Sequence, residues 1–264
     1  MAWFVKESAA NAVSLGNALS GFIAMTYVAD GRFTAAALFV YLAVLLDGLD
    51  GVVARRFGTR HALGGRLADA FADALSFCFA PALFLYALVY NPDRGSAWVD
   101  PSNALAVIAS TVVAAFGVLR LFRFAEADYE SPHFLGLPTP ANAMFLVSLA
   151  LLFGPDPWDL VAGAPGVVLL AALLSSALMV TEIPYPKVGD GFRTFAAVGS
   201  ALAVALVLPT VFFRGGPGCT FGSAGCPLIE LPLFAAAVGI MIAYIVGGPA
   251  YAKVGSRQEV VSVQ

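Results

Sequence analysis

The sequence is poor in charged residues. Only 12% of its 264 residues are charged and 60% are hydrophobic, whereas soluble domains carry about 25% charged residues. Too few polar side chains remain to cover a water-soluble globule of this length, so a water-soluble fold is excluded. Basic residues are also few, with 14 Lys and Arg against 17 Asp and Glu. Without a dense basic face the chain has no predicted nucleic-acid partner.

Histidine and cysteine are scarce as well. The only two histidines, His61 and His133, fall in predicted loops, so we do not expect a histidine-based metal site. Cys78 falls within a predicted helix, where a buried thiol behaves as a small hydrophobic residue. Cys219 and Cys226 share a predicted outer loop. A disulfide between them is chemically permitted in an oxidising compartment, and both outcomes stay open.

Long apolar runs dominate the chain. A segment must be about 20 residues long to cross roughly 30 Å of hydrocarbon. Such segments lie near residues 12–29, 33–54, 67–90, 103–125, 137–154, 160–181, 192–213 and 232–251. They predict an all-α fold, a polytopic membrane bundle of about eight transmembrane helices with no separate soluble domain.

The basic residues are distributed unevenly over the predicted loops. With the amino terminus in the cytoplasm, only Arg32, Arg94 and Arg214 lie outside. The other eleven lie inside, and they are Lys6, Arg55, Arg56, Arg60, Arg66, Arg120, Arg123, Lys187, Arg193, Lys253 and Arg257. This positive-inside bias predicts a multi-pass protein of the cell membrane with its basic loops in the cytoplasm.

Four aspartates interrupt two consecutive apolar segments. Their pattern is Asp47-x2-Asp50-Gly51-x2-Ala54-Arg55, followed by Gly65-x3-Asp69-x3-Asp73. On a helix, positions 47, 50, 51 and 54 share one face, and so do positions 65, 69 and 73. One aspartate at the centre of a bilayer costs roughly 2.5–3.5 kcal/mol. Four of them therefore need a compensating charge.

Divalent metal ions supply that charge most simply. Mg²⁺ and Mn²⁺ take oxygen ligands and are commonly shared between carboxylates and substrate phosphates, so we expect one or two ions, with two favoured. Gly51, Ala54 and Gly65 leave room for a nucleotide to approach the backbone. Arg55 can bond two phosphate oxygens at once. The pattern predicts a phosphate ester or anhydride as substrate.

Two other interpretations compete with a metal site. The aspartates could pair with the neighbouring arginines in a solvated loop, or they could carry ions or protons in a transporter. The small residues on the same faces argue against simple pairing. The position of the acids at the membrane boundary favours a site open to cytosolic nucleotide over a midplane ion path.

The aspartate pattern resembles the signature of the CDP-alcohol phosphotransferases, membrane enzymes that move a phosphatidyl-type group from a CDP-linked lipid to an alcohol. Other segments resemble one branch of that family, the CDP-diacylglycerol–serine O-phosphatidyltransferases and archaetidylserine synthases. These segments are residues 14–17, 76–81, 119–124, 136–140 and 179–187. The chain departs from the pattern by one extra residue between Arg55 and Gly65, by Ala70 in place of serine, and by Cys78 in place of glycine.

The resemblance implies a role for each matching residue. It makes Asp47, Asp50, Asp69 and Asp73 metal ligands, and it makes Asp73 also the base that activates the acceptor hydroxyl. Gly51, Ala54, Arg55 and Gly65 would line the CDP pocket. The resemblance further implies a homodimer and a six-helix catalytic core over residues 1–190, followed by two additional helices and a short tail over 191–264.

Three polar residues outside the aspartate pattern have open roles. Arg120 and Arg123 lie three residues apart near a cytoplasmic helix end. They could hold the lipid-linked phosphate or the carboxylate of serine, or they could anchor the helix at the interface. Asn17 lies within an apolar segment and needs a hydrogen-bond partner, either on a neighbouring helix or on the bound nucleotide.

Together these expectations describe an enzyme of phospholipid biosynthesis. CDP-diacylglycerol or CDP-archaeol binds with its tails in the bilayer, the hydroxyl of L-serine attacks the lipid-bearing phosphorus, and CMP leaves. The sequence does not distinguish acyl from isoprenoid ether chains. Glycerol phosphate or inositol phosphate as acceptor, a prenyl transferase and a non-enzymatic ion carrier are the alternatives.

Overall fold

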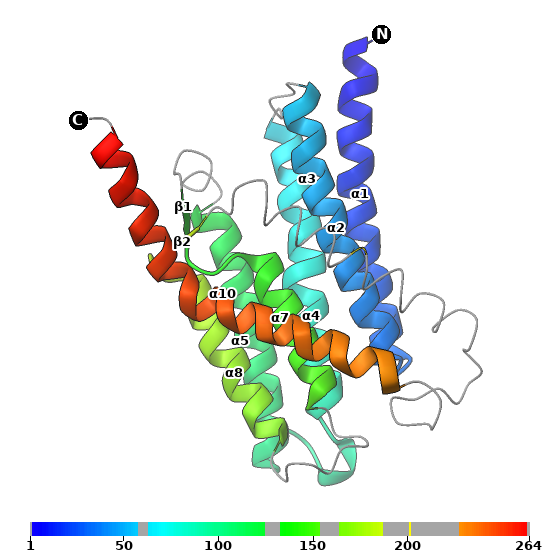
Figure 1. The fold of residues 1–264 in the computed structure, drawn as a ribbon. Coiled ribbons are helices and arrows are strands. Elements are labelled where there is room, and N and C mark those ends of the chain that lie inside the picture. The colour runs from blue at the N-terminus through cyan, green and yellow to red at the C-terminus, as the bar shows by residue number, and fades with distance from the viewer. Residues whose placement is uncertain are drawn as a thin grey trace.

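A computed structural model describes residues 2–57, 63–124, 133–153, 164–186, 201 and 227–262. These residues form mainly helices that pack side by side in one bundle (Figure 1). The helices are α1 (Ala2–Ala29), α2 (Phe33–Phe57), α3 (Leu63–Asp73), α4 (Ala80–Val89), α5 (Pro101–Phe124), α7 (Thr139–Leu152), α8 (Ala164–Met179) and α10 (Pro227–Ser262).

The helices have the length and composition of membrane spans. Four apolar stretches are long enough to cross a bilayer, namely Ala12–Ala29, Leu67–Val89, Pro101–Arg123 and Phe234–Ala252. Shorter apolar helices cover Phe33–Leu49, Thr139–Leu152 and Gly166–Met179. Seven of the eight predicted segments thus coincide with helical structure. The eighth, at 192–213, lies outside the described residues apart from residue 201. The described part of the chain is a helical membrane bundle.

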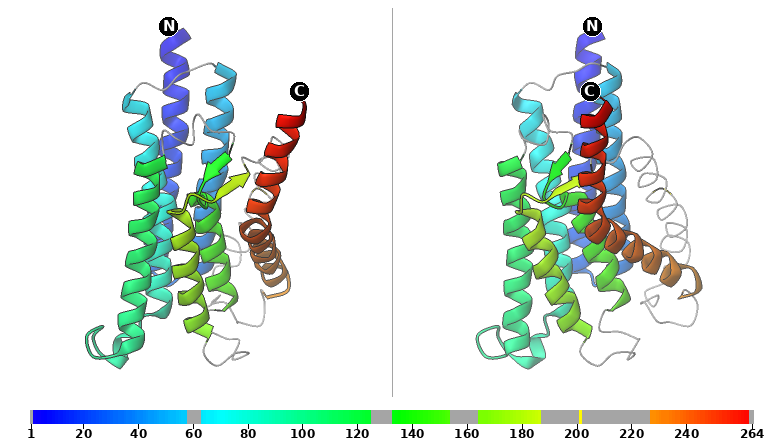
Figure 2. Two further views of the ribbon diagram at one scale, coloured as in Figure 1. Left: turned by 90° about the vertical axis from the view of Figure 1, so that its left-hand side faces the viewer. Right: turned by 60° about the vertical axis from the view of Figure 1, so that its left-hand side comes forward.

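The chain reverses direction so that its polar segments gather at one end of the bundle. The start of α1, the end of α2 and the start of α3 lie at that end, as does the end of α5 (Figures 1 and 2). The Asp30–Arg32 turn and the α4–α5 connection, which includes a short 3-10 turn at Pro92–Arg94, lie at the opposite end. The two halves of the aspartate pattern are therefore brought to the same side.

The helix that carries Asp69 and Asp73 contains a π-helical segment. It continues from α3 through the π-helix η1 (Ala74–Phe79) directly into α4, and the Ala80 N–H donates to the Leu75 carbonyl five residues earlier. Pro81 lies in the first turn of α4 and has no N–H to donate, which favours a local widening of the helix just before it. The wider turn buries Ser76, Phe77 and Cys78 just below Asp73.

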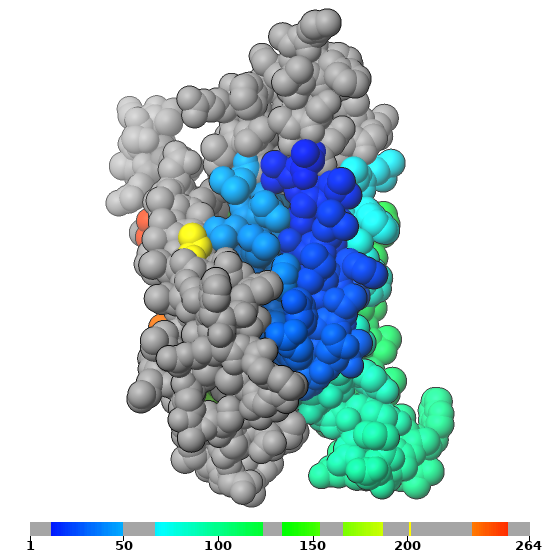
Figure 3. Space-filling view, turned by 90° about the vertical axis from the view of Figure 1, so that its right-hand side faces the viewer, coloured from blue at the N-terminus to red at the C-terminus, as the bar shows by residue number. Residues whose placement is uncertain are grey.

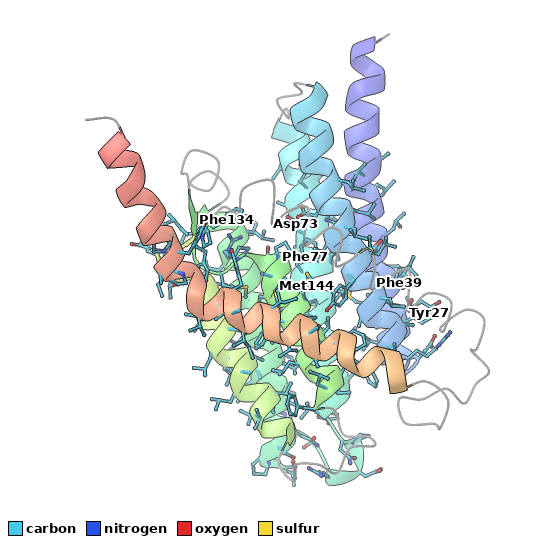
Figure 4. The ribbon with its side chains drawn as sticks, viewed as in Figure 1. Tyr27, Phe39, Asp73, Phe77, Phe134 and Met144 are labelled. Atoms are coloured by element: carbon cyan, nitrogen blue, oxygen red, sulfur yellow. The ribbon has the colours of Figure 1, made fainter. Side chains whose placement is uncertain are left out.

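An apolar core fills the space between the helices. Phe77 of η1, Phe84 of α4 and Phe234 of α10 are almost completely buried. Figure 4 shows Phe77 and Met144 in the middle of the bundle, below Asp73. One buried polar contact crosses this core, a hydrogen bond of 2.5 Å between the Tyr41 hydroxyl and Ser148 Oγ. The core includes Phe234 of α10, so this last helix packs against the bundle.

A short pair of strands modifies the predicted all-α fold. Pro184–Pro186 form strand β2, which pairs antiparallel with β1 (His133–Leu135). Burial of Tyr185 raises the pKa of its phenol. Its ring contacts that of Tyr244 with centroids 5.6 Å apart, and its hydroxyl donates to the Ile245 carbonyl at 3.4 Å. The pair of strands therefore holds α10.

Gly136 joins β1 to α7 through a backbone conformation that favours glycine. Its φ is +72°, and its N–H donates to the Ile183 carbonyl at 2.9 Å. Helix α7 begins shortly after it at Thr139, with a proline in its first turn, where proline is tolerated. This connection seats the start of α7 against the end of α8.

Gly136→Ala is expected to destabilise the protein more than Gly31→Ala. Both glycines have positive φ, +72° and +69°, which costs an alanine about 1–2 kcal/mol. At Gly136 the added Cβ would also lie 2.4 Å from the Met179 carbonyl oxygen, whereas Gly31 has nothing within 4 Å. Thermal unfolding in detergent measures the difference. Equal shifts in melting temperature would contradict the rigid contact described for Gly136.

Candidate functional site

Helix α1 has a polar face toward the bundle and an apolar face away from it. Ser14, Asn17 and Gly21 follow at i, i+3 and i+7, which places them on one side of the helix, and Ser14 and Asn17 are buried. Leu15, Leu19 and Phe22 are instead 51–59% exposed. Figure 3 shows this outward side, where α1 and part of α2 form the surface. The outward face suits lipid, and the inward face suits a polar site.

Three carboxylates from two helices meet at the inward face of α1. Asp47 of α2 and Asp69 and Asp73 of α3 line one small pocket together with Ser14 and Asn17 of α1. Val13 and Leu46 complete its wall. Figure 4 shows Asp73 inside the bundle, nearer than Phe77 to the end where α3 begins. Two consecutive helices thus contribute their acids to one pocket.

Hydrogen bonds from α1 hold both α3 carboxylates. Ser14 Oγ donates to Asp69 Oδ1 at 2.5 Å, and Asn17 Nδ2 donates to Asp73 Oδ1 at 2.9 Å. Ser76 Oγ in turn donates to the Asn17 backbone carbonyl at 2.8 Å. The partner that Asn17 requires in an apolar helix is therefore a side chain of the neighbouring helix.

The pocket has a strongly negative electrostatic character. Asp73 is repelled by Asp47 and by Asp69, and it is attracted by Arg120. All three carboxylates are half-buried among apolar helices, where mutual repulsion is weakly screened. A pocket of this kind stabilises bound cations.

The donor set fits a hard divalent cation. Carboxylate oxygens are among the ligands that Mg²⁺ and Mn²⁺ prefer, and the pocket supplies three carboxylates. Within the described side chains, no three carboxylates are close enough to form a closed metal-ligand cluster. Asp50, the fourth predicted ligand, lies in α2, but its side chain is outside the described ones.

The two arginines of α5 point to different environments. Arg120 is 5% exposed and close enough to Asp73 to attract it electrostatically. Arg123 is half-exposed, and its Nη2 lies 2.9 Å from Glu182 Oε1. Arg120 is therefore placed beside the pocket, whereas Arg123 links the end of α5 to the segment before β2.

The predicted CDP-pocket residues lie on the helices that carry the aspartates. Gly51, Ala54 and Arg55 follow Asp50 in α2, and Gly65 lies in the first turn of α3. Their side-chain surroundings fall outside the described residues. The backbone nevertheless places these positions toward the polar end of the bundle (Figure 1).

Close helix contacts set the geometry around the pocket. A Cβ on Gly21 would lie 2.4 Å from Ser76 Oγ and 2.7 Å from its Cα, and a Cβ on Gly117 would lie 2.6 Å from Cys78 Sγ. Helix α1 and helix α5 therefore both approach η1 at glycines. These approaches bring Asn17 to Asp73 from one side and Arg120 toward Asp73 from the other.

Two serines at the site lie in segments that resemble the family, 14–17 and 76–81, but no role was predicted for them. Ser14 and Ser76 both donate hydrogen bonds within or beside the pocket. The spacing of Ser14 and Asn17 at i, i+3 was a readable signal for Ser14. Ser76 had no such signal, because its position depends on the π-helical turn.

A family model described as CDP-alcohol phosphatidyltransferase matches residues 7–184. The chain belongs to this family. The matched region of the CDP-alcohol phosphatidyltransferase family includes every residue of the pocket and ends at the first residue of β2.

Related proteins from three organisms match the chain over a similar extent. The archaetidylserine synthase of Methanothermobacter thermautotrophicus is 32% identical over 70% of this chain and 72% of its own length. The CDP-diacylglycerol–serine O-phosphatidyltransferase of Methanocaldococcus jannaschii is 33% identical over 62% of this chain and 71% of its own length. That of Helicobacter pylori is 31% identical, over 72% and 77% respectively.

Gly117→Ala is expected to lower stability unless Cys78 is made smaller at the same time. The new Cβ would lie 2.6 Å from Cys78 Sγ and 3.1 Å from its Cβ, and Cys78→Gly removes both atoms. The two changes should therefore be non-additive in thermal unfolding, with Gly117→Ala less harmful in the Cys78→Gly background. Gly239→Ala, at a helical glycine with nothing within 4 Å, is the control. Strict additivity would contradict the close contact.

Proposed function

We propose that the protein transfers a phosphatidyl or archaetidyl group from a CDP-linked lipid to the hydroxyl of L-serine and releases CMP. The observation that carries this proposal is the meeting of Asp47, Asp69 and Asp73 in one pocket, at positions of the family's aspartate pattern. The choice of serine rests on the names of the relatives at about 30% identity.

Each residue of the pattern has a task in this reaction. Asp47, Asp50, Asp69 and Asp73 would hold one or two Mg²⁺ or Mn²⁺ ions. When bound, such ions neutralise charge on the pyrophosphate and on the reacting phosphoryl group. Gly51, Ala54, Arg55 and Gly65 would line the CDP pocket at the polar end of the bundle.

Asp73 is proposed as the base. Asn17 Nδ2 holds Asp73 Oδ1, and the second carboxylate oxygen can then accept the proton of the serine hydroxyl. The serine oxygen forms a bond to the lipid-bearing phosphorus, and the bond from that phosphorus to the oxygen bridging to CMP breaks. Arg120, buried next to this site, suits the lipid-linked phosphate or the serine carboxylate through its planar guanidinium. Arg123 would contact substrate only by exchanging its bond to Glu182.

The proposed reaction takes place at the cytoplasmic side of the cell membrane. The polar end of the bundle carries the predicted basic loops, which supports a cytoplasmic orientation, and CDP-lipid would enter from the bilayer with its chains among the apolar helix faces. The catalytic core is proposed to span residues 1–190, with residues 191–264 adding two further helices and a tail. We also propose a homodimer, as the family resemblance implies.

The acceptor is tested directly with purified protein in detergent. CDP-diacylglycerol or CDP-archaeol is supplied with Mg²⁺ or Mn²⁺ and, separately, L-serine, glycerol phosphate or inositol phosphate, and CMP release is measured. Serine alone should support turnover, and excess EDTA should abolish it because the aspartates need a cation. Turnover with another acceptor but not serine would overturn the assignment of serine. Release that persists without divalent ions would overturn the metal site.

Asp73→Asn is expected to reduce serine-dependent CMP release by at least about a hundredfold, because a general base contributes roughly 10²–10⁴-fold. Asp30→Asn, at the exposed turn on the opposite end of the bundle, is the matched control and should retain full activity. Melting temperatures of both variants check that the fold is intact. Substantial turnover by a folded Asp73→Asn protein would exclude Asp73 as the base.

A further inference from the structure

Helix α1 is held in a fixed register against the aspartate-bearing helices. Gly16 faces Leu46 of α2, where an added Cβ would lie 3.3 Å from the Leu46 side chain, and Gly21 meets the backbone of Ser76. Ser76 Oγ also bonds to the Asn17 carbonyl at 2.8 Å. The positions of Ser14 and Asn17 relative to the carboxylates are therefore set by backbone packing rather than by their side chains alone.

From this register, Ser14 and Asn17 each donate to one carboxylate of α3. Ser14 bonds Asp69 Oδ1, and Asn17 bonds Asp73 Oδ1. A carboxylate has about four acceptor sites on its two oxygens, so each acid keeps sites with which to reach a cation, and Asp73 also keeps one for the proton of the serine hydroxyl. Partners that hydrogen-bond a metal ligand from behind fix its orientation. Without them, two neighbouring negative groups would turn away from each other.

The Asn17 amide provides an independent sign of a ligand. Its nitrogen faces Asp73, since a carboxylate can only accept, and its Oδ1 therefore faces the other way. That oxygen is buried and has no hydrogen-bond partner within the described part of the chain. Asn17 is 3% exposed and lines the pocket. A buried carbonyl oxygen left unsatisfied is costly, so the pocket is built to receive a cation or a hydrogen-bond donor.

We propose that Ser14 and Asn17 are positioning residues that orient Asp69 and Asp73 for divalent-cation binding. The proposal rests on the metal site of the proposed function and extends it to α1, which carries none of the aspartates. Neither residue needs to touch the reacting atoms. Their contribution should appear as cation affinity, separate from the chemical step.

The experiment measures Mn²⁺ binding without any substrate. Purified protein in detergent is titrated with Mn²⁺, and the free ion is followed by electron paramagnetic resonance. Ser14→Ala and Asn17→Ala should each weaken binding about ten- to a hundredfold, as loss of such supporting partners typically does. Ser14→Thr keeps the hydroxyl and should restore binding to within about threefold of the parent. Ser20→Ala is the matched control, because Ser20 is buried on the same helix and donates only to the Gly16 carbonyl among the described contacts.

A second measurement separates positioning from a general loss of structure. In serine-dependent CMP release, Ser14→Ala and Asn17→Ala should need more Mn²⁺ for half-maximal rate while largely recovering the rate at saturating Mn²⁺. Melting temperatures without metal should stay near that of Ser20→Ala. Unchanged Mn²⁺ affinity in folded Ser14→Ala and Asn17→Ala, or an equal loss in Ser20→Ala, would overturn the proposal.

The outcomes distinguish this inference from the proposed function. If the parent binds Mn²⁺ and the α1 variants lose it, but no acceptor releases CMP, the positioning role stands and the proposed reaction fails. If serine-dependent release is intact and the variants bind Mn²⁺ normally, only the positioning role fails. Absence of Mn²⁺ binding in the parent would overturn both the positioning role and the metal site.

Discussion

Mutual repulsion among carboxylates in an apolar bundle is the constraint on which the rest of the structure depends. Asp47, Asp69 and Asp73 line one pocket where little water is present to screen them. Hydrogen-bond donors on neighbouring helices compensate for this repulsion, and the acids remain at the pocket. Ser14 and Asn17 each hold one carboxylate, and Arg120 attracts Asp73 from α5. The negative charge that remains favours the binding of a cation.

Small residues make this arrangement possible. Gly21 and Gly117 each lie against η1 where a side chain would collide, so α1 and α5 approach the π-helical turn from two sides. The turn itself follows Asp73 directly and precedes Pro81. A regular α-helix through Ser76 and Cys78 would rotate those side chains relative to Asp73. The placement of the acids is therefore coupled to an irregular segment whose sequence looks like an ordinary apolar helix.

Regular helical features that extend over many residues were predictable from the sequence, and short irregular features were not. Apolar runs identified seven helical segments, and helical spacing placed the aspartates on shared faces, because both depend on regular periodicity. The hydrogen bonds of Ser14 to Asp69 and of Ser76 to the Asn17 carbonyl were missed, since the sequence does not specify which helices become neighbours. The β1–β2 pairing was missed because both strands have only three residues and two of the three residues of β2 are prolines, so neither strand shows an alternating pattern. The assigned roles of the pattern residues stay predictions.

The contacts of α10 show that residues beyond the family match contribute to the core of the bundle. The family match stops at residue 184, yet Phe234 from beyond it is buried in the core, and Gly248 lies against Tyr185 and Pro186. A protein trimmed to the matched region would lose Tyr185 and Pro186 of β2 together with α10, and the apolar side chains of α7 that α10 covers would become exposed. The region matched by sequence similarity therefore does not contain all of the residues that form the core.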